Sequence, residues 1–78
     1  MNKTTALQEV WNETRIPLYD NFKGMFVTYC VIDTESCDKI ISILKKHGIE
    51  IIKWESDSGH FRFFFENVKP IEMRLILE

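Results

Sequence analysis

Apolar residues recur at helical spacing in the middle of the chain, at Cys37, Ile40, Ile41 and Leu44. Asp33 or Thr34 can cap the start of this helix, and Gly48 fits the left-handed position just beyond its end. Lys45 and Lys46 lie in the last turn, where cations offset the negative end of the helix dipole. The pattern therefore predicts a helix between residues 33 and 48.

A second helical pattern lies near the start of the chain, at Leu7, Val10 and Trp11. Thr5 and Gln8 fit a capping box, and Pro17 ends the pattern, so we predict a helix over about residues 5–15. Residues 16–24 contain several turn formers and are predicted to be a loop. We expect this loop to pack on the body of the protein, because it also contains Ile16, Leu18, Tyr19 and Phe22.

Four further segments have the composition or alternation of strands. Residues 25–32 are rich in β-branched and aromatic side chains on both faces, which predicts a central strand. Residues 49–56 and 60–66 flank an Asp-Ser-Gly turn and predict a hairpin. Residues 71–78 alternate apolar and charged side chains and predict a half-buried strand, with a short helix begun by Pro70 as the alternative.

The predicted element order is α-β-α-β-β-β. We expect one α+β domain over residues 1–78, a two-layer sandwich in which two helices cover one face of a four-stranded sheet.

The composition and charge of the chain disfavour several classes of function. Apolar residues make up 45% and aromatic residues 13% of the 78 residues, and no apolar run is long enough to span a membrane. The net charge of −2 disfavours a generic polyanion binder, although Lys45 and Lys46 are possible phosphate contacts. No secretory signal is visible, and two cysteines do not form a disulfide scaffold, so we expect a cytoplasmic protein.

Residues suited to catalysis are few. His47 ends a helix, His60 opens a strand, and the Asp, Ser and His of residues 57–60 lack a group that orients the histidine. Cys30 and Cys37 are interpreted as small buried apolar residues, and the short spacing of paired zinc ligands is absent. We expect no enzymatic activity, no cofactor and no metal.

The aromatic strand over residues 60–66 is the most informative feature. If Phe61, Phe63 and Phe65 form the core, Arg62 and Phe64 lie on an open face of the sheet. We expect partner contacts on that face, or beside it, from Trp54, Arg62, Phe64 and Lys53. Residues 71–78 are a possible edge strand for pairing, and a second copy of the chain is another possible cover.

These features favour a non-catalytic protein that binds another protein as a small regulator or inhibitor, by analogy with viral or mobile-element modulators. A homodimer is possible. The alternative is single-stranded nucleic-acid binding on an aromatic sheet face, with phosphate contacts from Lys45, Lys46, Lys53 and Arg62.

Two partial resemblances accompany this interpretation, each over at most about half the chain. The run from residue 31 to 51 is similar to the first β-α-β unit of ACT domains, through Asp33, Ile41, Leu44, Gly48, Ile49 and Ile51. This resemblance implies a dimeric small-ligand sensor. The strands over 25–30 and 60–66 resemble the stacking motifs of RNA-recognition motifs, which implies stacking on Phe26 and on Phe63 or Phe65. Both families place a second helix before the last strand, and the 12 residues after Glu66 are too few for both elements.

Overall fold

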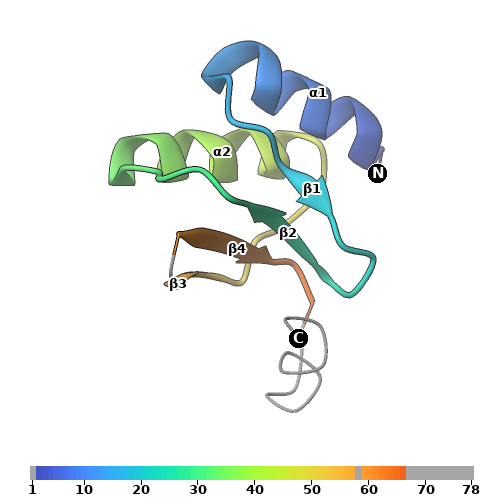
Figure 1. Cartoon of the computed structure of the whole chain (residues 1–78). Coiled ribbons are helices and arrows are strands. Elements are labelled where there is room, and N and C mark those ends of the chain that lie inside the picture. The colour runs from blue at the N-terminus through green and yellow to red at the C-terminus, as the bar shows by residue number, and fades with distance from the viewer. Residues whose placement is uncertain (1, 58, 67–78) are drawn as a thin grey trace.

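The computed structural model describes residues 2–57 and 59–66, which form two helices and a four-stranded antiparallel sheet (Figure 1). The elements are α1 (Lys3–Thr14), β1 (Tyr19–Asp20), β2 (Met25–Thr28), α2 (Thr34–Lys46), β3 (Lys53–Asp57) and β4 (His60–Phe64). The predicted α+β class is confirmed. The predicted order α-β-α-β-β-β was wrong, because the observed order is α-β-β-α-β-β. The strand or helix predicted over 71–78 lies outside the described residues.

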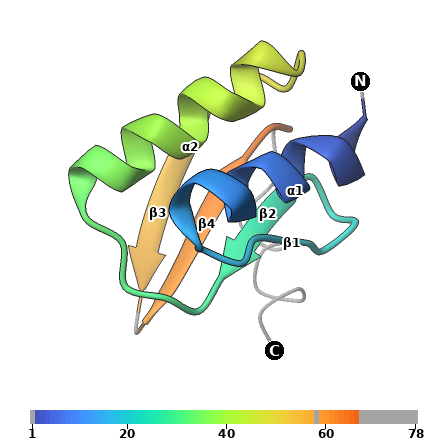
Figure 2. The same ribbon diagram turned by 90° about the horizontal axis from the view of Figure 1, so that it is seen from above.

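The strands lie in the order β1-β2-β4-β3, and both helices cover the same face of the sheet (Figure 2). Because β4 is antiparallel to both of its neighbours, β2 and β3 run parallel to each other with β4 between them. The segment from β2 to β4 is therefore a split β-α-β unit followed by a returning strand. The second helix and the fourth strand, α1 and β1, come from the residues before this unit.

Strand β1 lies in the segment that was predicted to be a loop. Its two residues pair with β2, Tyr19 with Val27 and Asp20 with Phe26. The pairing closes a tight loop over residues 21–24, and the Asn21 N–H donates to the Met25 carbonyl at 3.3 Å. Two residues are too few to show the alternation of apolar and polar side chains that marks a strand, so sequence analysis finds only turn-forming residues in this segment.

Strand β2 is shorter than the predicted strand over residues 25–32, because its partner ends first. Thr28 is opposite Phe61, and β4 begins one residue earlier at the hairpin turn. Beyond Thr28 the chain turns, and the Cys30 N–H donates to the Thr28 hydroxyl at 3.3 Å.

The β3–β4 hairpin is confirmed, with changed boundaries. The predicted strand over 49–56 begins only at Lys53, and the predicted strand over 60–66 ends at Phe64. The N–H groups of Phe65 and Glu66 donate to the Gly24 carbonyl at 3.1 and 3.2 Å, so β4 leaves the ladder there.

Helix α1 begins before the predicted capping box. Asn2 is the N-cap, and its side-chain oxygen accepts from the Thr5 N–H at 3.1 Å. Gln8 donates instead to Asn12 at 3.0 Å. The helix ends at Arg15, whose left-handed backbone directs its N–H to the Trp11 carbonyl at 2.8 Å.

Helix α2 has the predicted caps. The Asp33 carboxylate accepts from the Ser36 N–H at 2.7 Å. Gly48 has a φ of 81°, and the N–H groups of Gly48 and Ile49 donate to the carbonyls of Lys45 and Leu44 at 2.9 Å. Glycine suits this position because it has no Cβ to oppose left-handed backbone.

The main core lies between the sheet and both helices. It is a cluster of eleven buried residues, in which Phe26 and Phe63 from the sheet are fully buried with Val10, Ile40 and Leu44 from the helices. A second buried cluster of Met25, Val27 and Phe64 lies on the opposite face of the sheet. Strand β2 is therefore buried on both faces, as predicted for a central strand.

Candidate functional site

The strand register defines three rows of side chains on the face of the sheet that the helices do not cover. One row contains Met25, Phe64 and Lys53. The next crosses all four strands, through Tyr19, Val27, Arg62 and Glu55. The third contains Tyr29 and His60, whose rings meet edge to face with centroids 4.7 Å apart. We call this surface the helix-free face.

Exposure differs strongly between side chains on the helix-free face. Met25 and Phe64 are fully buried, whereas Tyr19 is 55% and Tyr29 66% exposed. The Tyr19 and Tyr29 ring centroids lie 6.5 Å apart, so these two rings and His60 form one exposed aromatic cluster. Aromatic rings exposed side by side are characteristic of contact surfaces, because they bury a large area with few rotatable bonds.

Phe22 extends from the loop between β1 and β2. Its side chain is 84% exposed, and its backbone has a φ of 61°, in the left-handed region. The carboxylate of Asp20 accepts from the Phe22 N–H at 2.8 Å, and the Asn21 side-chain oxygen accepts from the Lys23 N–H at 2.9 Å. The expected packing of this residue on the body of the protein was wrong. Two short side-chain hydrogen bonds instead hold the loop in a conformation that presents the phenyl ring.

Two of the residues predicted to bind a partner are buried. Phe64 is fully buried and Arg62 is 4% exposed. The Arg62 guanidinium lies 3.7 Å from the Glu55 carboxylate across the β3–β4 pair. These residues form the floor of the helix-free face, and their role in binding stays a prediction.

The other two predicted contacts lie on opposite faces of β3. Lys53 is on the helix-free face, where its Nζ lies 4.7 Å from the centre of the Phe64 ring and 3.2 Å from Glu55. Trp54 is opposite Phe63 and lies on the helix side, stacked on Phe61 with ring centroids 5.8 Å apart. The structure therefore groups Lys53 with Arg62 and Phe64 but separates Trp54 from them.

The basic cluster at the end of α2 is partly neutralised by α1. Glu9 forms an ion pair with Lys46, and the His47 Nε2 donates to the other Glu9 oxygen at 2.8 Å. Hydrogen bonds from Lys46 and His47 lower the pKa of Glu9 from 4.5 to about 2, and the bond to Glu9 raises the pKa of Lys46. This contact joins the two helices, and both Lys45 and Lys46 remain exposed.

The remaining candidate residues are dispersed. Of the stacking residues that the RNA-recognition resemblance implies, Phe26 and Phe63 are fully buried on the helix side of the sheet, and Phe65 is partly buried with its ring centroid 4.7 Å from that of Phe26. Burial raises the pKa of the Cys37 thiol, and the Ser36 N–H lowers the pKa of Asp33. Among residues 2–57 and 59–66, no three His, Cys, Asp or Glu side chains come together where a metal ion could bind.

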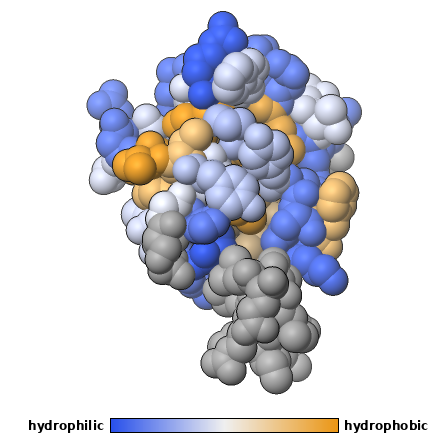
Figure 3. All heavy atoms as spheres, in the orientation of Figure 1, coloured by the Kyte–Doolittle hydropathy of each residue, from blue (hydrophilic) through white to orange (hydrophobic). Residues whose placement is uncertain are grey.

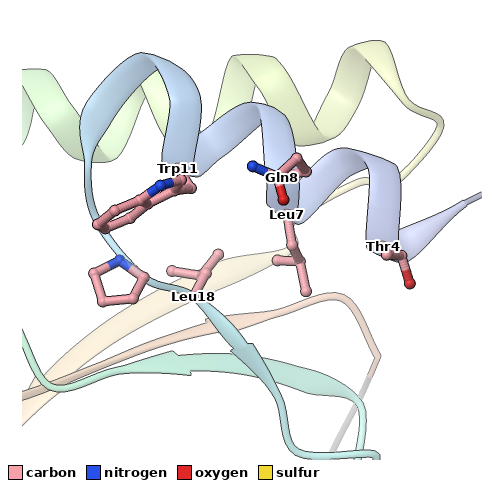
Figure 4. Close-up of a pocket in the computed structure, with 6 residues that line it drawn as sticks. Thr4, Leu7, Gln8, Trp11 and Leu18 are labelled. Carbon is pink, nitrogen blue, oxygen red and sulfur yellow. The ribbon is translucent and has the colours of Figure 1, made fainter.

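A shallow apolar groove of about 310 Å³ lies on the helix layer, between α1 and the segment before β1 (Figure 4). Leu7, Trp11 and Leu18 face this groove, and Thr4 and Gln8 lie at its rim. The Arg15 guanidinium lies 5.4 Å from the centre of the Trp11 ring. Its volume lies at the lower end of the range of small-molecule sites, and Thr4 and Gln8 are the polar residues that line it.

Exposed apolar side chains are spread over the described surface, at Trp11, Tyr19, Phe22, Tyr29, Val31, Ile52 and Trp54. On the side seen in Figure 3, hydrophobic atoms occur in separate groups among hydrophilic ones.

Comparison of the chain with family models, curated proteins and solved structures found no match. Neither helix in the described part of the chain is long and apolar enough to cross a membrane.

Sequence reasoning missed the exposed residues of the β1–β2 hairpin, Tyr19, Phe22 and Tyr29. The turn formers Asp20, Asn21 and Gly24 indicated a tight loop. Phe22 lies between them, and its apolar side chain was predicted to be buried rather than exposed to solvent.

Proposed function

We propose that this chain is a non-catalytic, cytoplasmic protein-binding module that acts as a small regulator or inhibitor by covering the surface of a partner protein. Its contact surface consists of the exposed aromatic cluster (Tyr19, Tyr29 and His60) and the neighbouring Phe22. The two cysteines, Cys30 and Cys37, are both free thiols, which is compatible with a reducing compartment.

The exposure and backbone of Phe22 carry the proposal. A left-handed backbone destabilises a residue with a Cβ by roughly 1–2 kcal/mol. Burial of the Phe22 side chain does not offset this free energy, because the side chain is 84% exposed. Strained residues of this kind concentrate at functional sites, and a ring that projects from a rigid hairpin is suited to fill a pocket on a partner.

Charge favours a protein over a nucleic acid as this partner. The net charge is −2, Lys46 is paired with Glu9, and Arg62 is close to Glu55. Single-stranded nucleic acid requires unpaired cations beside the stacking rings, and its binding weakens steeply with salt. These ion pairs weaken the nucleic-acid alternative.

An affinity experiment tests the proposal. The wild-type chain and a Phe22→Gly, Tyr29→Ala double variant are immobilised and exposed to extract of the source cells, with and without nuclease treatment, and bound proteins are identified by mass spectrometry. Trp11→Ala is the matched control, because it removes an exposed aromatic ring from the helix layer. Circular dichroism confirms that each variant folds.

We expect a protein that the wild type and the control retain in equal amounts and the double variant loses. Equal recovery on all three chains contradicts the proposed surface. Recovery that requires intact nucleic acid and falls steeply with salt supports the nucleic-acid alternative instead.

A further inference from the structure

Strand β3 forms an open edge of the sheet. It has five residues and pairs through one side with β4. Within residues 2–57 and 59–66, no strand pairs with its outer side. An open edge presents unpaired backbone N–H and C=O groups, which are a template for another strand.

Apolar side chains flank this edge. Trp54 is 42% exposed although its ring stacks on Phe61, and Ile52, directly before the strand, is 52% exposed. A strand that pairs with the outer side of β3 would bring further side chains beside Trp54 and Ile52 and reduce their exposure. The stacked Phe61 ring also limits the freedom of Trp54, which reduces the entropic cost of a new contact there.

The charges of β3 favour a second copy of this chain as the occupant. Lys53 and Glu55 alternate on the helix-free face, with opposite signs two residues apart. A two-fold axis perpendicular to the sheet pairs the strand with itself in antiparallel direction. If the axis passes at Trp54, Lys53 lies opposite the partner subunit's Glu55, and this opposite-charge pair occurs twice.

Neighbouring symmetric registers are less favourable. A two-fold axis at Lys53 places the Lys53 side chains of the two copies opposite each other, and an axis at Glu55 places the two Glu55 carboxylates opposite each other. Like charges directly opposite each other destabilise a strand pair. The register centred on Trp54 also places the two indole rings side by side on the helix side of the joined sheet. We propose that β3 pairs with β3 of a second copy in this register and joins the two sheets into one of eight strands.

This homodimer uses the edge of the sheet opposite to β1. It is therefore independent of the proposed contacts of Phe22, Tyr19 and Tyr29, and either proposal can fail without the other. The β1 edge has only two paired residues and no alternating charge, so it does not specify such a pairing.

A charge-complementation experiment tests the register. Lys53→Glu places acidic side chains at both position 53 and position 55, and Glu55→Lys places basic side chains at both positions. By sedimentation velocity we expect a concentration-dependent dimer for the wild type, monomers for each variant alone, and a dimer again in the equimolar mixture. Lys39→Glu, which makes the same charge change on the exposed surface of α2, is the matched control and is expected to dimerise.

A cysteine experiment tests the same register without charge changes, since Lys53 also contacts Phe64. In antiparallel pairs, opposite Cα atoms are roughly 4.5–5.5 Å apart, a distance that a disulfide spans. In a Cys30→Ser background, we expect Trp54→Cys to form a cross-linked dimer under mild oxidation and Ser56→Cys to remain uncross-linked. A monomeric wild type at all concentrations, a dimer that ignores both charge variants, or equal cross-linking at 54 and 56 overturns the proposal.

Discussion

Replacing Phe22 by glycine should make the protein more stable. Phe22 holds a φ of 61° at the tip of the β1–β2 hairpin, and the Asp20 carboxylate accepts from its N–H at 2.8 Å. Glycine adopts this backbone without a steric cost and keeps the same N–H donor. Because the phenyl ring is 84% exposed, its removal sacrifices little buried area.

Two opposing free-energy terms set the size of the expected change in stability. Relief of the left-handed backbone contributes roughly 1–2 kcal/mol, and the greater freedom of glycine in the unfolded chain costs about 0.5–1 kcal/mol. The difference of these ranges is a net gain of about 0–1.5 kcal/mol, and its midpoint of ~0.75 kcal/mol corresponds to a rise in Tm of about 3–6 °C in a domain of this size. Phe22→Ala keeps the Cβ and the strain, so its stability should stay within about 0.5 kcal/mol of the wild type.

Thermal and urea denaturation followed by circular dichroism measure both variants. The comparison of Gly with Ala isolates the backbone term, since both lack the ring. If Phe22→Gly is less stable than Phe22→Ala, the left-handed backbone at position 22 does not destabilise the fold. The argument that Phe22 is a strained and exposed residue is then refuted. A more stable Phe22→Gly variant that loses its partner shows that the ring is kept for binding rather than for folding.

Three further results are expected. Phe63→Ala and Phe64→Ala should each lower the free energy of unfolding by roughly 3–5 kcal/mol, because both rings are fully buried, and a near-native Tm for either in a thermal melt contradicts that burial. Glu9 has a folded-state pKa of about 2, below its ordinary 4.5, so its contact with Lys46 stabilises the fold fully above pH 4.5 and is lost as the pH falls toward 2. The Tm difference between wild type and Glu9→Gln should therefore shrink over that interval, whereas a constant difference argues against the ion pair. Gly48→Ala should cost about 1 kcal/mol in urea denaturation through backbone strain alone, because a Cβ there meets no atom within 4 Å.

The elements that the sequence predicts best are those whose signals are local. Asp33 and Gly48 mark the two ends of α2 because capping depends on residues within one turn. Burial of β2 on both faces follows from its continuous run of apolar and β-branched residues. These signals need no knowledge of distant partners.

The features that the sequence predicted wrongly or left open depend on contacts with residues outside the segment itself. Strand β1 exists because Tyr19 lies opposite Val27 across a tight loop, and two residues are too few to show a period. The face on which Trp54 lies is set by its register with Phe63, which the hairpin sequence alone leaves open. The helix at the start of the chain was predicted from its local pattern, whereas the predicted order of elements was wrong because the two-residue strand β1 was missed.

The same topology bears on how the chain folds. Phe26 pairs with Phe63 almost half the chain length away, whereas the β3–β4 hairpin closes over a few residues. Closing a long loop has an entropic cost before any contact forms, so the local hairpin and α2 are expected to become ordered before β2 joins β4. Helix α1 packs against α2, and β1 pairs with β2. The β1–β2 hairpin also closes over a few residues, so the loop that carries Phe22 is expected to form with β2 before β2 joins β4.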